Sequence, residues 1–372
     1  MYLRNLSIVD FRNYVEAALQ LSPQANFFTG LNGSGKTNLL DAVHYLCACK
    51  SAFNPIDSQS IRHEAGFFVI QGSFDKNGTV HEVYCGVKTG QKKVFKRNHK
   101  EYERLADHIG LFPVVIISPY DTDLIHEGSE ERRKFTDSII SQFNRGYLED
   151  LIRYNKALLQ RNMLLRDFAV RRYFDEETLH IWDLQLAEPG NRIHEARKTF
   201  IEQFNPEFLK AYHAISQSRE DVSLRYRSEL HEATMEEILL RNRERDRHLQ
   251  RSDGGIHKDD FVFGIGNYPL RKFGSQGQQK TFLIALKLAQ FEFVREHCGI
   301  KPILLLDDIF DKIDETRLAC LMELVSRHTF GQVFVSDTHE YRVPALFRNA
   351  GAEMKVFRVH QGTVEELETQ PG

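Results

Sequence analysis

One eight-residue stretch has the residue types and the spacing of a loop that binds phosphate. It fits the pattern G-x-x-x-x-G-K-[ST], in which glycines let backbone N–H groups turn inward around a polyphosphate at the start of a helix. The residues are Gly30, Leu31, Asn32, Gly33, Ser34, Gly35, Lys36 and Thr37. We expect Lys36 to contact the β- and γ-phosphates and assist catalysis, and the Thr37 hydroxyl to ligate Mg²⁺. The stretch therefore predicts a site for a nucleoside triphosphate.

The segments on either side of this loop are those that such a loop requires. Residues 24–29 have the pattern of a short strand, and residues 38–46 carry apolar side chains at helical spacing. The alternative is a glycine-rich turn with a solvated lysine, which the strand–loop–helix order disfavours. Upstream, Arg12 and Asn13 are candidates to contact the phosphates or the base, and a solvated turn is the other interpretation of this pair.

Carboxylates and other polar groups end two further apolar runs. Residues 303–306 and 332–336 each predict a strand that is buried on both faces. The first run ends in Asp307 and Asp308, and the polar groups after the second are Asp337, Thr338 and His339. Apolar residues followed by aspartate are common in α/β proteins, so this pattern alone is a weak signal.

A third segment opens a long amphipathic helix that we expect to reach about residue 297. It consists of Ser275, Gln276, Gly277 and Gln278. Taken alone, such a segment is more often an ordinary helix cap than a nucleotide contact. Its position after the phosphate loop, and its distance of about thirty residues from Asp307, make it a candidate.

The middle of the chain has a different secondary-structure pattern from both ends. From about residue 129 to 250, strand patterns nearly vanish and long charged helical stretches replace them. Strand patterns return after this helical region, at residues 260–265. The predicted parts are an N-terminal lobe over 1–127, a helical arm over 128–254 and a C-terminal lobe over 255–372.

Other local patterns predict structure more than chemistry. Residues 67–74 and 79–87 read as a hairpin, and residues 147–173 read as a long helix. We expect a third arm helix over 176–204 to be interrupted at Pro189. The basic segment 92–100 has two interpretations, a patch that contacts phosphates or a strand edge guarded by lysines.

Composition excludes some classes of protein. With 41% hydrophobic and 27% charged residues, the 372-residue chain is expected to be globular, and its net charge of −3 gives no overall attraction to nucleic acid. No apolar run is long enough to span a membrane, and no apolar targeting segment is recognised, so we expect a cytoplasmic protein. The five cysteines are scattered, and we expect all of them to be reduced.

The order of these segments resembles that of ATP-binding-cassette (ABC) ATPases. Ser275–Gln278 resembles their signature, 303–308 their Walker B strand, and 311–314 falls at the spacing of their D-loop. By this resemblance Asp307 is the carboxylate on the magnesium side and Asp308 the catalytic acid. The distance from Lys36 to Ser275 is longer than in transport ATPases, because the helical arm interrupts the head, and that layout is typical of the SMC class.

Within that class the sequence is similar to the RecF family over nearly its whole length. The segments that carry this similarity are 11–14, 118–121, 128–137, 154–162 and 257–260. The resemblance implies an ATP-dependent clamp of recombinational repair that binds DNA at single-strand gaps or junctions and hydrolyses ATP slowly, stimulated by DNA. It also implies roles in replication-fork maintenance and the SOS response.

The same resemblance implies a mechanism and partners. ATP held at Gly30–Thr37 of one protomer would be capped by Ser275–Gln278 of another, so that the nucleotide joins a homodimer. The expected partners are DNA, RecR and RecO, and indirectly RecA. A transport ATPase with a membrane partner is one rival interpretation, and the arm-length insertion argues against it. The other is a structural clamp that binds ATP but does not depend on its hydrolysis.

Overall fold

The computed structural model describes residues 1–216, 220–309, 330–339 and 353–367, and it separates into two compact units. The first unit comprises 1–121, 214–216 and 283–372, and the second comprises 122–213 and 217–282. Residues 255–282, which the sequence analysis places in the C-terminal lobe, are in the second unit. They join it because β10 (Asp260–Ile265) pairs along its length with β9 (Val222–Arg227).

A mainly parallel sheet forms one half of the first unit. Its strand order is β15-β14-β3-β13-β12-β8, in which only the edge strand β15 runs antiparallel to its neighbour. The bounds are Ala25–Thr29 (β3), Val114–Ile117 (β8), Ile303–Asp307 (β12), Val333–Asp337 (β13), Met354–His360 (β14) and Thr363–Leu367 (β15). All five residues of β3, of β12 and of β13 are buried, as expected for central strands covered on both faces.

An antiparallel sheet forms the other half of the first unit. Its strand order is β2-β1-β4-β5-β6-β7. The bounds are Tyr2–Phe11 (β1), Tyr14–Gln20 (β2), Phe67–Lys76 (β4), Thr79–Lys88 (β5), Val94–Arg97 (β6) and Lys100–Glu101 (β7). The predicted hairpin is confirmed as β4 and β5. The basic segment 92–100 contains the outer strand β6 and the start of the edge strand β7, where Lys93 bonds to Asp57 and to the carbonyl oxygen of Cys49.

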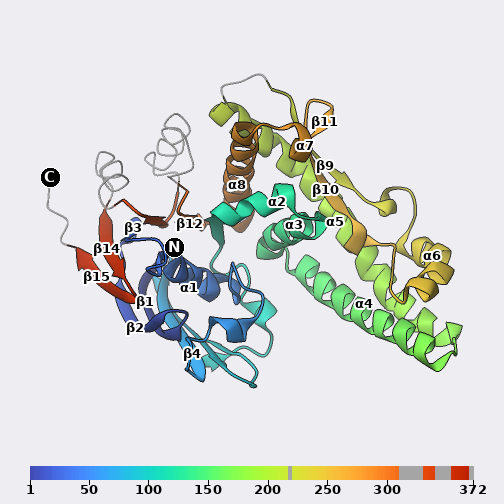
Figure 1. Ribbon diagram of the computed structural model, residues 1–372, viewed down its shortest axis with the longest axis horizontal. Coiled ribbons are helices and arrows are strands. Elements are labelled where there is room, and N and C mark those ends of the chain that lie inside the picture. Colours follow the sequence, from blue (N-terminus) through green and yellow to red (C-terminus); the bar gives the residue numbers. More distant parts are fainter. Residues whose placement is uncertain (217–219, 310–329, 340–352, 368–372) are drawn as a thin grey trace. The chain divides into compact units, whose positions relative to one another are not determined.

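Helix α1 (Lys36–Ala48) packs against both sheets of the first unit (Figure 1). Leu39, Val43 and Leu46 recur at helical spacing and are fully buried. The Tyr45 ring meets Phe68 of β4 edge-on at 5.6 Å, while Phe28 of β3 stacks on Phe334 of β13 at 6.2 Å. One continuous apolar core thus fixes the helix that follows the glycine-rich loop.

The second unit is mainly helical (Figure 1). Its helices are α2 (Asp123–His126), α3 (Ser129–Phe143), α4 (Arg145–Arg171), α5 (Glu176–Ser216), α6 (Met235–Leu249) and α7 (Leu270–Phe273). A three-stranded sheet of order β11-β10-β9 accompanies them, with β11 at Tyr268–Pro269. Helix α8 (Gln276–Cys298) begins in this unit and continues into the first.

The expected interruption at Pro189 is wrong. Helix α5 runs without a break through Pro189 and Pro206. A proline inside a helix costs about 3 kcal/mol through its lost hydrogen bond and its ring clash. Leu186 and Ile193, on either side of Pro189, are fully buried, and each such side chain contributes about 1.5–3 kcal/mol on burial. Burial of these apolar side chains therefore outweighs the local cost of a proline inside the helix.

Two buried arginines join the helices of the second unit. Arg161 of α4 binds Asp183 of α5 at 2.7 Å and Asp246 of α6 at 2.6 Å, and both its side chain and that of Asp246 are fully buried. Arg197 of α5 binds Asp137 of α3 and Asp259, each at 2.9 Å. Burial raises the pKa of Asp246 and of Asp259, and the paired arginines oppose that rise.

Within the described ranges, no helix is both long enough and apolar enough to cross a membrane. The four cysteines that the structure describes, Cys47, Cys49, Cys85 and Cys298, are free thiols, as expected.

We predict that Asp246→Ala destabilises the protein strongly, because it leaves the buried Arg161 guanidinium with too few partners. The free energy of unfolding should fall by about 3–5 kcal/mol. The matched control is Asp167→Ala, which removes the exposed i,i+4 partner of Arg171 and should change stability by less than about 1 kcal/mol. Urea unfolding followed by circular dichroism measures both, and equal effects of the two substitutions would contradict the prediction.

Candidate nucleotide site

The glycine-rich loop connects β3 to α1 and depends on glycine at two positions for different contacts. At Gly30 a Cβ atom would lie 2.2 Å from the carbonyl oxygen of Val359 in β14. At Gly35, whose φ is +120°, a Cβ atom would lie 2.7 Å from the Asn13 side chain. Neither position has room for a side chain, so the sheet and the N-terminal segment press the loop from both sides.

Lys36 is folded back over this loop. Its Nζ donates to the carbonyl oxygens of Gly30 at 2.8 Å and Leu31 at 3.2 Å, and it lies 3.9 Å from Oδ1 of Asp308. The side chain is 3% exposed, so its charge is held within the loop. An ammonium group in this place can meet an anion that enters the loop.

Hydroxyls and carboxylates meet beside the start of α1. The Thr37 hydroxyl donates to Oδ1 of Asp307 at 2.8 Å, and the Ser336 hydroxyl lies 2.8 Å from the same oxygen and 3.2 Å from Oδ1 of Asp308. The backbone N–H of Asp308 donates to Ser336 Oγ at 2.9 Å. The structure therefore brings together Lys36, Thr37, Asp307 and Asp308, as the sequence analysis expects.

Burial raises the pKa of Asp307 above its ordinary value, and hydrogen bonds from Ser336 and Thr37 oppose that rise. Asp307 is only 2% exposed. A desolvated carboxylate gains from a nearby cation, which favours its ionised form. A hard divalent cation prefers such oxygen ligands, so Thr37 and Asp307 have the donor chemistry of a Mg²⁺ site.

Polar side chains from the β1–β2 turn hold the loop from the other side. Asn13 donates to the carbonyl oxygen of Ser34 at 2.9 Å and accepts from Asn38 at 2.7 Å, and the Tyr14 hydroxyl donates to the carbonyl oxygen of Gly35 at 3.0 Å. Asn13 thus contacts the loop itself, while its predicted contact with the nucleotide stays a prediction.

Arg12 has a different environment. Its guanidinium bonds to Asp41 of α1 at 3.2 Å and to Ser51 at 3.3 Å, and its backbone has a φ of 56°. Two buried polar atoms near the loop, Ser34 Oγ and Arg12 Nε, have no hydrogen-bond partner among the described residues. Such atoms are normally satisfied in proteins, so they fit a polar ligand with phosphate oxygens.

The expected signature residues form the first turn of α8, in the second unit. Ser275 N–H donates to the Gln278 side chain at 2.7 Å, and Gln278 N–H donates to Ser275 Oγ at 3.2 Å, which is a reciprocal helix cap. The Gln278 amide also donates to Glu220 at 2.7 Å. Since Ser275 Oγ accepts in this cap, its own O–H remains able to donate, and both Ser275 and Gln276 are exposed.

The structure adds contacts that the sequence analysis does not predict. Of the three polar residues expected after the second buried strand, Asp337 ends β13, and its side chain accepts from the N–H of His339 at 3.0 Å. Ser336, which the sequence analysis does not single out, is the residue that contacts both aspartates. A lone serine gives no signal in sequence, and only the pairing of β12 with β13 reveals it. The predicted D-loop at 311–314 lies outside the described residues.

Asp121, in the segment 118–121 that carries part of the family similarity, has a structural role. It accepts from the N–H of Ser118 at 2.8 Å and pairs with the buried Lys287 of α8 at 2.7 Å.

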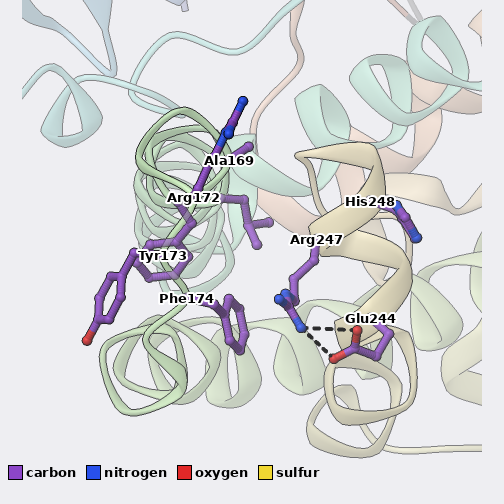
Figure 2. Close-up of a pocket in the computed structure, with 9 residues that line it drawn as sticks. Ala169, Arg172, Tyr173, Phe174, Glu244, Arg247 and His248 are labelled. Atoms are coloured by element: carbon purple, nitrogen blue, oxygen red, sulfur yellow. Dashed lines mark hydrogen bonds and ion pairs between the residues drawn. The ribbon is translucent and has the colours of Figure 1, made fainter.

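A separate pocket lies within the second unit, between the end of α4 with the connection that follows it and the end of α6 (Figure 2). Its volume is about 350 Å³. The Arg247 guanidinium lies 4.0 Å from the centre of the Phe174 ring and binds both carboxylate oxygens of Glu244, at 3.0 and 3.2 Å. Glu244 thus already neutralises the charge of Arg247, and no glycine-rich loop lines the pocket. The pocket therefore does not resemble the nucleotide site.

Three features define the head of an ABC-type ATPase of the SMC class: a glycine-rich loop between a central strand and a helix, two carboxylates at the end of another parallel strand of the same sheet, and an interrupting helical unit. The family model for the "RecF/RecN/SMC N terminal domain" matches residues 2–365. An Smc head domain from Pyrococcus furiosus shares the fold, with a TM-score of 0.56 at 16% identity over 98% of this chain and 96% of that chain.

More similar proteins narrow the assignment. The DNA replication and repair protein RecF of Flavobacterium johnsoniae is 50% identical over 96% of this chain and 100% of the relative, and that of Bacteroides thetaiotaomicron is 48% identical over 99% of both. A structure of the recombination mediator protein RecF with ATP, in the RecFOR pathway, aligns with a TM-score of 0.89 at 30% identity, over 99% of this chain and 98% of that one. The chain belongs to the RecF family.

We predict that Gly30→Ala and Gly33→Ala differ in stability, although both add one methyl group to the same loop. Gly33 has a φ of +78°, but no atom lies within 4 Å of the place an added methyl carbon would take, so only backbone strain of about 1–2 kcal/mol is expected. Gly30→Ala also forces the loop away from Val359, which should cost about 1–3 kcal/mol more. Thermal unfolding without nucleotide measures both variants, and equal losses would show that the loop does not press on β14.

Proposed function

We propose that this chain is an ATP-dependent DNA clamp of recombinational repair, which dimerises on ATP and releases DNA after slow, DNA-stimulated hydrolysis. The observation that carries the proposal is the cluster of Lys36, Thr37, Asp307 and Asp308 beside the glycine-rich loop, in a chain of the RecF family. That a related RecF is described with ATP supports the choice of nucleotide.

Each side chain of the cluster has a proposed role. The loop N–H groups and Lys36 bind the polyphosphate, and Thr37 with Asp307 would hold Mg²⁺, which neutralises phosphate charge when bound. Asp308 orients and polarises the attacking water. Asn13 positions the loop, and both Asn13 and Arg12 are proposed to contact the nucleotide from the β1–β2 turn.

Dimerisation is proposed to join the two functional segments of different protomers. The first turn of α8 presents backbone N–H groups and the Ser275 hydroxyl, and a helix N-terminus favours an anion such as a γ-phosphate. In this proposal Ser275, Gln276, Gly277 and Gln278 cap the nucleotide of a second copy. The N- and C-terminal lobes form the head, and residues 128–254 act as its arm.

In the cell the clamp is proposed to act at single-strand gaps or junctions, with DNA, RecR and RecO as partners and RecA loading as the outcome. Roles at replication forks and in the SOS response follow from the same proposal. The family name and the pathway given for a related RecF support these assignments.

We predict that Lys36→Met weakens ATP binding, because it removes the cation held inside the loop. Loss of a hydrogen bond to a charged group costs about 1.5–3 kcal/mol, which is roughly a 10- to 150-fold loss of affinity. Lys88→Met, at an exposed position at the end of β5, is the matched control and should bind ATP normally. Titration with a fluorescent ATP analogue measures both, and unchanged affinity of the Lys36 variant would place the nucleotide elsewhere.

We predict opposite outcomes for Ser275→Arg and Asp308→Asn. Ser275→Arg leaves the protomer's own loop intact, so ATP binding should persist while ATP-induced dimers and ATP-dependent DNA retention are lost. Asp308→Asn should lower hydrolysis by about 100-fold or more, because the amide cannot polarise water. Asparagine also tolerates the left-handed backbone of this position, where φ is 42°, so the fold should be kept.

Sedimentation with ATP, DNA retention and phosphate release measure these outcomes. Because its ATP-bound dimer is not consumed, the Asp308 variant should hold DNA longer than the unmodified protein. A Ser275→Arg protein that still dimerises with ATP, or an Asp308→Asn protein that hydrolyses ATP normally, would overturn the clamp mechanism.

A further inference from the structure

The outward face of α4 carries a seam of six exposed residues at alternating spacings of four and three. They are Ile152, Lys156, Leu159, Met163, Arg166 and Val170. The four apolar side chains are 48%, 57%, 52% and 83% exposed in chain order. This spacing is the a/d repeat of a coiled coil, in which such positions are normally covered by another helix.

The fold of the second unit does not use this face. Residues that α4 buries against its own unit lie on its other side, and they include Tyr154, Ala157, Arg161, Leu165 and Phe168. At 100° per residue, the four apolar seam residues fall within an arc of about 40°. The helix is therefore apolar on two opposite sides, and the described residues cover only one of these sides.

The seam is narrow and long, which favours a helix as its occupant. It extends for about 27 Å, from a rise of 1.5 Å per residue between Ile152 and Val170. A helix that lies on a lipid surface presents a broad apolar face, often with large aromatic side chains. An arc of about 40° matches the strict a/d seam of paired helices instead.

Two basic residues on the seam specify the chemistry of the occupant. Lys156 and Arg166 are exposed and form no ion pair with any described residue. We propose that the α4 seam docks an amphipathic helix of a partner protein, with apolar residues opposite Ile152, Leu159, Met163 and Val170 and carboxylates opposite Lys156 and Arg166. The two charged layers would fix the register of that helix, because a slipped pairing buries them against apolar groups.

A second copy of this chain is a poor occupant of the seam. An antiparallel pairing centred on the seam places Lys156 in the same layer as Arg166 of the other copy, and a parallel pairing places each cation against itself. Helix α4 as a whole has six basic and three acidic residues, so two such helices repel. Like charges that face one another across an interface disfavour the wrong partner.

The test uses two synthetic 21-residue helical peptides with blocked ends and a fluorescent label. Both present apolar residues to the four apolar positions; one has glutamate and the other lysine at the two positions that face Lys156 and Arg166. Fluorescence anisotropy with the full chain should show the glutamate peptide binding at least about tenfold more tightly than the lysine peptide. The double variant Lys156→Glu with Arg166→Glu should reverse that preference.

Variants separate the seam from other exposed apolar residues. Leu159→Glu with Met163→Glu should lower the affinity of the glutamate peptide by about tenfold or more, while ATP affinity stays unchanged. Leu240→Glu, at a 63% exposed position on α6, is the matched control and should bind the peptide normally.

Several results would overturn the proposal. They are a dissociation constant weaker than about 1 mM for the glutamate peptide, equal binding of both peptides, or an equal loss in the Leu240 variant. Seam-dependent self-association in sedimentation without nucleotide would make a second copy the occupant. Seam-dependent binding to vesicles of phosphatidylcholine with phosphatidylglycerol would make it a lipid surface.

Discussion

The candidate site depends on the pairing register between β12 and β13. That register sets Asp307 beside Ser336, and β13 is in turn paired with β3, so that Asp337 is beside Thr29. Since parallel strands end at a common edge, the loop after Thr29 opens beside Asp307, and Thr37 reaches a carboxylate 270 positions away in sequence. A slip of two residues would move Asp307 by about 7 Å and break that hydrogen bond.

A buried side-chain amide specifies the pairing register of these strands, which burial of apolar residues alone does not fix. Every residue of β3, β12 and β13 is buried on one face of the sheet or the other. A slip of one residue would therefore move no apolar side chain into solvent, and burial alone does not fix the register. Gln332, just before β13, specifies the register through its hydrogen bonds. Its side chain accepts from the N–H of Leu3 at 2.7 Å and donates to the carbonyl oxygens of Leu3 and Ser22, at 2.8 and 2.7 Å. A displaced strand would leave this buried amide unsatisfied, which costs about 1–3 kcal/mol.

Sequence patterns predict the parts of this site that are local. The strand before the loop, the loop itself and the run that ends in Asp307 are each recognisable within ten residues, and the structure contains all three. Ser336 and Asn38 are not predicted, because a single serine or asparagine acquires its role only through pairing with a distant segment. The continuous helix through Pro189 is missed for a related reason, since burial of Leu186 and Ile193 is a property of the packed unit.

Helix α8 links residues 275–278, which are proposed to cap a nucleotide, to the first unit. Apart from residues 214–216, the chain lies outside the first unit between Asp121 and Leu283. Lys287, one turn after Leu283, binds Asp121 at 2.7 Å and the carbonyl oxygen of Ile116 at 3.0 Å. Lys287 is 7% exposed, so breaking this pair would leave a buried charge without a partner.

The first turn of α8 belongs to the second unit and lies eleven residues before Lys287 in the sequence. Because β8 pairs with β12, with Ile117 beside Leu306, the carbonyl that Lys287 holds lies one strand away from the aspartates of the site. The helix that begins at Gln276 therefore also carries the lysine that bonds to β8, the strand next to the one that ends in Asp307.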